Sequence, residues 1–342
     1  MHQSLAVKYR PQTFEEVCGQ STTVTILKQA IIKGTFKNAY LFAGDSGCGK
    51  TTLARLFAKE INHGVGTPIE IDAASNNGVD NVRSIMEEAS QRSLDSEYKI
   101  FIIDECHSIT AQGWQAFLKG IEEPPAYTIF MFCTTEPSKI PETILNRVQR
   151  YNIVKIDNNS IYNRLKYICE QEGFSNYDTT CDLLSKVTNG CMRDAITYLE
   201  QCASYSTDLS LENAKRVVSQ LSYEPMFKLM WGLIQKDDKE VLNTVNGLYA
   251  NGVDLKAFVD SFLNLSINIL KYALFDDISV TNIPAYLATE DNPVVQHTIK
   301  LAENTSWFNK LIDTLLSIKL EIKYDPNSQL TLAAFLLRLC RQ

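Results

Sequence analysis

Residues 41–61 read LFAGDSGCGKTTLARLFAKEI, and this stretch decides the fold class. It begins as a short apolar run, passes through small residues from Gly44 to Gly49, and continues as a helical pattern from Lys50. A strand, a tight loop and a helix in this order point the N–H groups of the loop into one anion-binding concavity. The spacing fits the G-x-x-x-x-G-K-[ST] phosphate loop. We therefore expect the chain to bind a nucleoside triphosphate.

The residues of the phosphate loop have separate expected roles. The glycines let the backbone approach the phosphates, Lys50 reaches the β and γ phosphates as a point charge, and the Thr51 hydroxyl ligates Mg²⁺. A glycine-rich turn with an exposed lysine is the alternative, and the strand before the loop and the helix after it disfavour that alternative. The predicted nucleotide-binding residues of this segment are Gly44, Asp45, Ser46, Gly47, Cys48, Gly49, Lys50, Thr51 and Thr52.

The bulk composition is that of an ordinary globular protein, with 342 residues of which 45% are hydrophobic and 21% are charged. A chain of this length has room for two or three domains. The net charge of −7 argues against a generally basic surface that coats nucleic acid, so any DNA contact is expected to be local. Nine cysteines lie scattered without a C-x-x-C pair, and no apolar run has membrane-spanning length. We expect reduced thiols, a cytoplasmic location and no membrane partner.

The first part of the chain alternates strand-like and helix-like segments. Short apolar strands are predicted at 38–44, 68–73, 98–105, 127–135 and 149–156, with helices between them, including 79–91 and 112–121. This alternation is typical of a parallel sheet that is covered by helices on both faces. Strand signals stop near Ile156, where DNNS supplies a polar break. We predict an α/β domain over residues 1–157.

The rest of the chain has helical periodicity. Residues 158–222 are predicted to form a small helical domain, with Ile161, Leu165 and Ile168 on one helix face. Residues 223–342 are predicted to form a second all-α domain, in which apolar side chains recur at three- and four-residue steps. The residues of these two stripes are Phe258, Phe262, Leu265, Ile269 and Tyr272, then Leu332, Phe335, Leu336 and Leu339.

Polar residues that suit phosphate chemistry follow two other strands. Asp104 and Glu105 end the apolar run KIFIIDE, at the edge where open α/β sheets hold their ligands. In phosphate-loop ATPases an aspartate there helps to hold Mg²⁺, and the adjacent Glu105 suits the general base. Thr134 and Thr135 end the next strand, where a hydroxyl can sense the γ-phosphate, although a Thr pair capping a strand is the plainer interpretation. Arg147 taken alone is a solvated arginine or half of a surface ion pair.

Several separate motifs together resemble one family. KYRPQTFEEVCGQ (8–20), GDSGCGKTT (44–52), IEIDAASNNGVDNVR (69–83), FIIDECHSI (101–109), IEEPP (121–125), TILNRVQR (143–150) and GCMRDAI (190–196) occur in the order found in bacterial DNA polymerase III gamma/tau subunits. LEIKYDPNSQLTLAAFLLRLC (320–340) is similar to the last helices of that family. The resemblance implies an AAA+ ATPase domain, a helical lid and an α-helical collar that forms oligomers.

The resemblance also implies roles for individual residues. The segment holding Tyr9, Arg10 and Pro11, with Val17 and Gly19 nearby, lies against the adenine. Thr135 matches the first sensor. Arg147 matches the arginine finger that reaches the ATP site of the adjacent subunit, and Arg193 matches the second sensor that moves the lid. The expected catalytic set is Lys50, Asp104, Glu105, Thr135, Arg147 and Arg193, and the expected magnesium ligands are Thr51 and Asp104.

The implied partners are those of a sliding-clamp loader. They are delta-like and delta′-like subunits, further copies of the chain in a pentameric ring, the clamp, and primer–template DNA. A helix that begins in ASNNGVDNVRS, with caps available at Ser75, Asn76 and Asn77 and with Arg83 behind them, suits contact with DNA phosphates. An ordinary capped surface helix explains that segment equally well.

The sequence departs from the family pattern at two places. The finger triplet reads Asn146-Arg147-Val148 instead of Ser-Arg-Cys. Family members usually carry a four-cysteine zinc module after the phosphate-loop helix, but here INHGVGTP (61–68) holds no cysteine and one His63. A structural zinc site needs four ligands, so ATP and Mg²⁺ are the predicted cofactors and zinc is not.

Two other functions compete with a clamp-loader motor. A helicase or branch-migration motor is one alternative, because DECH at 104–107 matches the DExH form. The pattern predicts no second α/β motor domain, and a lid and collar suit ring assembly better. A scaffold that does not hydrolyse ATP is the other alternative, and it conflicts with the set of Lys50, Thr51, Asp104 and Glu105.

Overall fold

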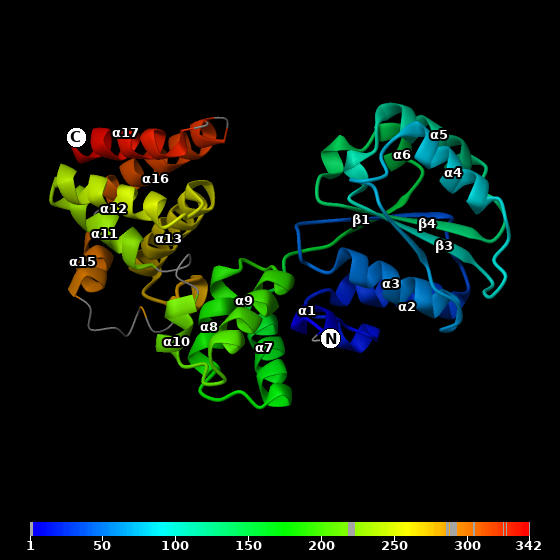
Figure 1. The fold of residues 1–342 in the computed structure, drawn as a ribbon, viewed down its shortest axis with the longest axis horizontal. Coiled ribbons are helices and arrows are strands. Elements are labelled where there is room, and N and C mark those ends of the chain that lie inside the picture. The colour runs from blue at the N-terminus through cyan, green and yellow to red at the C-terminus, as the bar shows by residue number, and fades with distance from the viewer. Residues whose placement is uncertain are drawn as a thin grey trace. The chain divides into compact units, whose positions relative to one another are not determined.

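The computed structural model describes residues 3–217, 223–284, 287, 293–303, 305–323, 325 and 327–341 (Figure 1). The chain forms two compact units, the first of residues 1–168 with 188–200 and the second of residues 169–187 with 201–342. Residues of the predicted lid segment, 158–222, therefore belong to both units. The three-domain division remains a prediction.

A five-stranded parallel sheet forms the centre of the first unit. In space its strands follow the order β2-β3-β4-β1-β5, and every neighbouring pair is parallel. The predicted α/β architecture is confirmed. The strands are β1 (Ala39–Ala43), β2 (Ile69–Asp72), β3 (Lys99–Asp104), β4 (Thr128–Thr134) and β5 (Gln149–Asn152).

The register of the sheet brings the polar strand ends to one edge. Ala43 pairs with Thr134, and Asp72 pairs with Asp104. The Gly44 N–H donates to the Thr134 carbonyl at 3.1 Å, which carries the ladder one residue into the phosphate loop. Because parallel strands end at the same edge, the loop after β1, the end of β3 and the end of β4 become neighbours.

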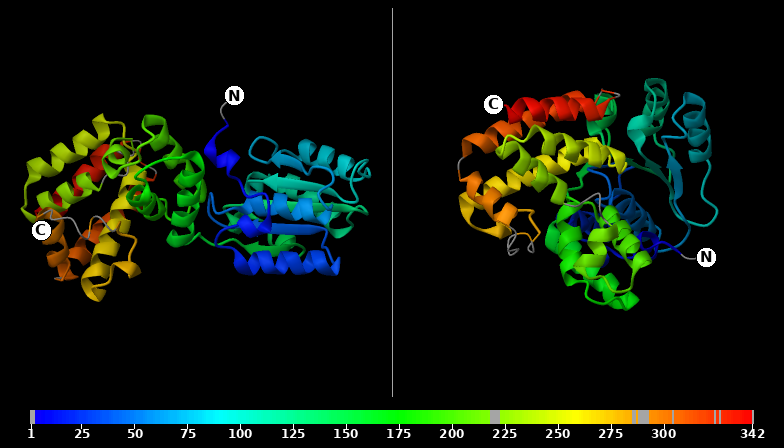
Figure 2. Two further views of the ribbon diagram at one scale, coloured as in Figure 1. Left: turned by 90° about the horizontal axis from the view of Figure 1, so that it is seen from below. Right: turned by 60° about the vertical axis from the view of Figure 1, so that its left-hand side comes forward.

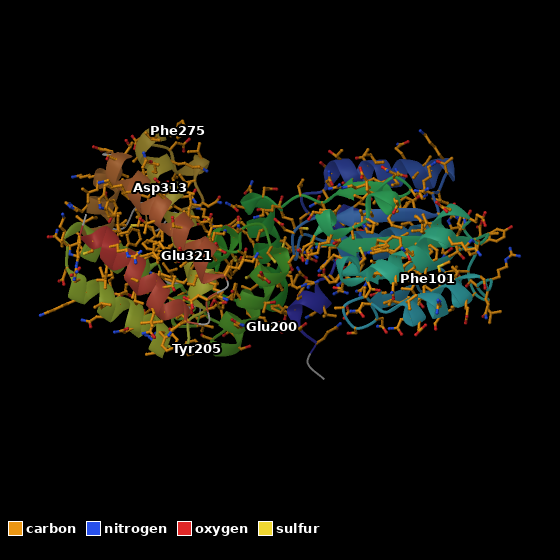
Figure 3. All side chains as sticks on the ribbon, turned by 90° about the horizontal axis from the view of Figure 1, so that it is seen from above. Phe101, Glu200, Tyr205, Phe275, Asp313 and Glu321 are labelled. Carbon is orange, nitrogen blue, oxygen red and sulfur yellow. The ribbon has the colours of Figure 1, made fainter. Side chains whose placement is uncertain are left out.

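Helices cover both faces of this sheet, as Figures 1 and 2 show. α2 (Ser21–Lys33) and α3 (Lys50–Ile61) pack on one face, where Leu27, Leu53 and Phe57 are fully buried. The other face holds the second core, which includes Phe101 of β3 (Figure 3). The helices of that face are α4 (Val79–Ala89), α5 (Ala111–Glu122) and α6 (Glu142–Leu145). Burial on both faces explains the continuous apolar strands.

The last strand is shorter than its pattern predicts. The apolar run 149–156 predicts one strand, but β5 ends at Asn152. The buried Gln20 side chain donates to the Val154 carbonyl at 2.7 Å and accepts from the Val154 N–H at 3.3 Å. In a longer strand the N–H and carbonyl of Val154 would bond to the neighbouring strand. Here the Gln20 side chain bonds to both groups, so the chain can leave the sheet with its backbone still hydrogen-bonded.

The segment after the sheet is helical, as predicted. Its helices are α7 (Asn158–Glu172), α8 (Asp178–Val187), α9 (Met192–Tyr205) and α10 (Leu211–Val217). Ile161, Leu165 and Ile168 on α7 are fully buried, which confirms that helix face. One parallel bridge between Ser175 and Asp208 is an exception to the all-helical prediction. Shorter elements elsewhere are α1 (Leu5–Lys8), η1 (Phe14–Glu16), η2 (Cys106–Ser108) and η3 (Pro137–Lys139).

The C-terminal helices share one hydrophobic core. They are α11 (Glu224–Ile234), α12 (Asp238–Ala250), α13 (Leu255–Phe275), α15 (Pro293–Ala302), α16 (Thr305–Ile322) and α17 (Ser328–Cys340), with η5 (Ile278–Val280) after α13. Both predicted stripes lie in this core, with Tyr272 and Phe335 partly buried and the other members buried. Figure 3 labels Phe275 at the end of α13 and Asp313 and Glu321 on α16. Over the described residues, no helix combines the length and apolarity needed to cross a membrane.

Candidate nucleotide-binding site

The loop between β1 and α3 has the form of an anion-binding nest. Gly49 has a φ of 104° and opens α3, and Lys50, the first residue of that helix, is only 7% exposed. Lys50 Nζ donates to the Asp45 carbonyl at 2.8 Å, so the ammonium group lies inside the curve of the loop. Within the described part of the chain, the N–H groups of Ser46, Gly47 and Gly49 donate to no other protein group. The loop therefore offers uncommitted donors beside a buried cation.

Two of the loop glycines are required by close packing. A Cβ atom on Gly44 would lie 2.2 Å from the Ile153 carbonyl oxygen. A Cβ atom on Gly47 would lie 2.1 Å from Cys191 Sγ, and Gly47 also has a φ of 67°. We expected these glycines to let the backbone approach the phosphates. Contacts within the protein also require glycine at both positions, so that explanation is incomplete.

The carboxylate of Asp104, the last residue of β3, meets the start of α3. The Thr51 hydroxyl donates to Asp104 Oδ2 at 2.7 Å, and the Glu105 N–H donates to Asp104 Oδ1 at 3.0 Å. A hydroxyl and a carboxylate are the oxygen ligands that Mg²⁺ prefers. Thr51 and Asp104 therefore fit a magnesium ion that is shared with a bound triphosphate.

Glu105 is held by the residue that follows β4 and by a residue of η2. Thr135 Oγ1 donates to Glu105 Oε2 at 3.2 Å, and His107 Nδ1 lies 3.3 Å from the same oxygen. The neighbouring Thr134 hydroxyl is fully buried and lies 3.2 Å from His107 Nδ1, so Thr135 and not Thr134 contacts the carboxylate. Glu105 itself has a φ of 46°, in the left-handed region. Sparsely populated backbone geometry of this kind is concentrated at functional sites.

A cavity of about 300 Å³ joins the loop to these carboxylates. Its walls include all the loop residues from Ser46 to Thr52, together with Asp104 and Glu105. Gly44, Asp45, Thr135 and Arg147, which the sequence placed in the site, do not line it. The residues expected at the adenine and the lid do line it, namely Tyr9, Arg10, Pro11, Val17 and Arg193.

Two thiols beside the loop are kept neutral by their surroundings. Burial raises the pKa of Cys48, whose Sγ donates to the Asp45 carbonyl at 2.7 Å. Burial likewise raises the pKa of Cys191 to about 12. Since the thiolate is the reactive form, both residues behave as small packing groups beside the loop.

Comparison with known proteins gives the family. Residues 63–157 match the family model of the DNA polymerase III delta subunit. The tau subunit of Bacillus subtilis DNA polymerase III is 34% identical over 77% of this chain and 50% of its own length. The gamma subunit of Buchnera aphidicola is 28% identical over 98% of both chains. The chain belongs to the DNA polymerase III gamma/tau family. It spans about half the length of relatives such as the Escherichia coli tau subunit, of which it covers 55%.

Solved structures support the fold of this gamma/tau family member. The RuvB Holliday junction branch migration motor of Thermotoga maritima has a TM-score of 0.53 at 18% identity, covering 66% of this chain and 79% of that one. A point variant of the same motor has a TM-score of 0.54 over the same shares of the two chains. At this identity the likeness concerns the fold alone and carries no function.

Arg147 of this gamma/tau chain lies outside its own cavity. Its Nη2 pairs with Glu122 Oε1 at 2.6 Å, and its Nη1 donates to the Thr143 carbonyl at 2.7 Å. Glu122 ends α5 in the motif IEEPP, and the Arg147 side chain is 39% exposed. The residue is therefore held at the surface in a fixed direction, with part of its side chain open to solvent.

The segment proposed to contact DNA is capped differently from its prediction. α4 has Gly78 as its N-cap, without a capping side chain. Ser75 and Asn76 instead bond to Asp72, and Arg83 pairs with Asp80 at 3.1 Å on an exposed surface. The Asp72 contacts close the turn after β2, so those side chains cannot also cap the helix.

Among the residues that the structure describes, no three His, Cys, Asp or Glu side chains gather to hold a metal ion. Where a zinc module would lie, the Asn62 side chain makes two hydrogen bonds to the backbone of Tyr98. Asn62 Nδ2 donates to the Tyr98 carbonyl at 2.8 Å, and Asn62 Oδ1 accepts from the Tyr98 N–H at 2.9 Å. The absence of zinc stays a prediction.

Arg164 and His107 are among the polar residues of this gamma/tau site that sequence reasoning missed. Arg164 on α7 lines the cavity and donates to the Tyr9 carbonyl, 155 positions earlier, at 2.7 Å. His107 contacts Glu105 and also lies 3.4 Å from Glu136 Oε1 through Nε2. A histidine two residues after the predicted general base is a detectable signal for His107. Arg164 has no local signal, because its partner depends on how α7 packs against the N-terminal segment.

Proposed function

We propose that this chain is an ATP-hydrolysing motor subunit of a DNA polymerase III-type clamp loader. The observation that carries the proposal is the 2.7 Å hydrogen bond between Thr51 and Asp104, in one cavity with the buried Lys50. A phosphate cradle, a magnesium position and a carboxylate base within reach of each other support hydrolysis of a bound triphosphate. The relatives named gamma and tau support the clamp-loader setting.

The reaction uses groups of this chain in separate roles. Lys50 and the free N–H groups of the loop bind the β and γ phosphates. Mg²⁺ held by Thr51 and Asp104 neutralises phosphate charge when it is bound. Glu105 takes a proton from the attacking water. At the same time the water oxygen bonds to the γ-phosphorus, and the bond between the γ-phosphorus and the β–γ bridging oxygen breaks. ADP leaves with that bridging oxygen, and the phosphate carries the oxygen of the water.

The trans role of Arg147 is part of the same proposal. In its own chain Arg147 pairs with Glu122 and does not line the cavity. An arginine supplied by a neighbouring subunit contributes about 10³ to 10⁵ in rate. This corresponds to roughly 4 to 7 kcal/mol at 1.36 kcal/mol per decade. Hydrolysis would then wait for correct packing of subunits in the ring.

ATP binding would organise copies of this chain and delta-like and delta′-like partners into the pentameric ring that opens a sliding clamp. Primer–template DNA would trigger hydrolysis, and the clamp would close around the duplex. Arg193 on the lid would report whether the γ-phosphate is present. We place the complex in the cytoplasm, and the nine cysteines of the chain, which form no disulfide, suit a reducing compartment.

Clamp-stimulated ATPase activity tests this function. The chain is purified with candidate delta-type partners, and ATP turnover is measured with clamp, with primer–template DNA, and with both together. Stimulation that requires both supports the proposal. ATP-dependent separation of duplex strands in the absence of any clamp would support a helicase instead and overturn it.

A further inference from the structure

Arg164 connects the lid to the segment that covers the base end of the cavity. It lies on α7 and lines the cavity beside Tyr9. Its Nη2 donates to the Tyr9 backbone carbonyl at 2.7 Å. A guanidinium donor makes this a charge-assisted bond, which is stronger than a bond between neutral groups. The contact therefore ties two segments that lie 155 positions apart in the sequence.

Aromatic contacts reinforce the same junction. The Arg164 guanidinium lies 5.2 Å from the centre of the Tyr167 ring, one helical turn further along α7. The Tyr167 ring meets the Tyr9 ring edge to face, with 6.3 Å between the centroids. Arg164, Tyr167 and Tyr9 thus form a closed set of three pairwise contacts. Such a set holds the arginine in one orientation, so that little side-chain freedom remains to be lost when the bond forms.

The lid touches the cavity through two arginines, at different ends. Arg193 on α9 lies at the phosphate loop, since a Cβ on Gly47 would be 3.3 Å from Arg193 Cβ. Arg164 lies at the N-terminal segment, where Tyr9, Arg10 and Val17 form the wall. The two residues therefore act on different parts of one bound nucleotide.

We propose that Arg164 is a latch that controls nucleotide release. Its bond to the Tyr9 carbonyl holds the N-terminal segment closed over the base and ribose, and the nucleotide leaves when that bond opens. This inference rests on the proposed function, because it needs an adenine nucleotide in the cavity. Arg164 is a positioning residue: it acts through the Tyr9 segment and makes no contact with the reacting phosphates. The latch consequently acts equally on ATP and ADP.

Dissociation rates of fluorescently labelled ADP and ATP test the latch by stopped flow. Arg164→Gln keeps much of the side-chain stem and removes the charge and the planar fork. We expect both nucleotides to leave roughly ten- to a hundredfold faster, as for the loss of one charge-assisted hydrogen bond. Arg193→Ala is expected to change ATP release more than ADP release. Arg92→Gln is the matched control, since Arg92 also stacks on a tyrosine ring, 4.4 Å from Tyr127, and does not line the cavity.

Further variants separate the latch from a general loss of structure. Tyr167→Leu removes the aromatic platform but leaves the Arg164 donor, and a few-fold faster release is expected. Arg164→Lys keeps a cationic donor without the planar fork, and an intermediate rate is expected. Circular dichroism checks that each variant is folded, and Arg164→Lys decides the question should Arg164→Gln not fold.

Three results would overturn the latch. They are unchanged release from a folded Arg164 variant, acceleration confined to ATP, and equal acceleration in the Arg92 control. A wild-type chain that binds no adenine nucleotide would instead overturn the proposed function itself.

Discussion

The Thr51 hydroxyl donates a 2.7 Å hydrogen bond to Asp104, and this bond joins the start of α3 to the end of β3. The two residues are 53 positions apart, and both line the cavity. The pair places the two predicted magnesium ligands at one point, directly after the lysine of the phosphate loop.

Removing this hydroxyl is expected to abolish magnesium-dependent hydrolysis. Thr51→Val keeps the shape of the side chain, and ATP turnover should fall by about 10² or more because phosphate charge is no longer neutralised in place. Binding of ATP in the presence of EDTA should change little. Thr25→Val is the control, because Thr25 on α2 donates only to the Ser21 carbonyl. Magnesium dependence equal to that of the wild type would contradict the assignment of Thr51.

Substitutions of Lys50 and Glu105 are expected to affect ATP binding and ATP hydrolysis separately. Lys50→Ala removes the buried cation, and ATP affinity should fall roughly ten- to a hundredfold or more. Glu105→Gln keeps the contact surface but not the base, so binding should persist while turnover falls by about 10² to 10⁴. Calorimetric titration measures the first effect and single-turnover hydrolysis the second. Equal loss of binding in both variants would argue against these separate roles.

Arg147 is expected to matter only in the assembled complex. Arg147→Ala should leave ATP affinity nearly unchanged and lower stimulated turnover by about 10³ to 10⁵. The isolated chain should show the same slow turnover with and without the substitution. Mixing the variant with Lys50→Ala chains gives a sharper test, because a Lys50→Ala subunit can still supply its finger to a neighbour. Turnover that is not restored in any mixture would contradict action in trans.

Gly47 is expected to be intolerant of a methyl group. Gly47→Ala places a Cβ 2.1 Å from Cys191 Sγ at a φ of 67°, which should destabilise the first unit by about 1–3 kcal/mol. Adding Cys191→Ala removes the clash but not the backbone strain, so it should restore part of the loss. Thermal unfolding of the two single variants and the double variant measures the coupling. Purely additive effects would show that the two residues do not meet in solution.

Tyr40 is expected to give the protein a pH-dependent stability above pH 10. Its ring is 1% exposed, its hydroxyl accepts from the Lys37 N–H at 2.7 Å, and burial raises its pKa to about 12. The unfolded chain loses this proton near pH 10, whereas the folded chain keeps it to pH 12. The contribution is therefore complete below pH 10 and falls by about 2 to 3 kcal/mol as pH rises to 12.

Urea unfolding of the wild type and Tyr40→Phe across pH 8 to 11 measures this contribution. The variant lacks the titrating group, so the stability advantage of the wild type should shrink as the pH rises. A constant difference across that range would show that the Tyr40 pKa is not raised by folding.

Several features of this protein are determined by short stretches of sequence. The phosphate loop, the strands of the sheet and the helix stripes of the C-terminal core depend on interactions within a few residues, such as glycine geometry and the periods of strands and helices. These local rules also located Asp104 and Glu105 at a strand end. They failed at β5, where the backbone bonds of Val154 are taken by the distant side chain of Gln20.

The sequence by itself therefore determined the element types, the phosphate loop and the family, because each depends on the spacing of residue types within short segments. Tertiary structure decided which distant groups meet: Thr51 with Asp104, Gly47 with Cys191, and Arg164 with the Tyr9 carbonyl. Each of these contacts depends on strand order, register and helix packing, which bring together residues 53 to 155 positions apart. The residues next to a side chain in the sequence do not reveal such a partner, because the partner's position depends on how the whole sheet and its helices pack.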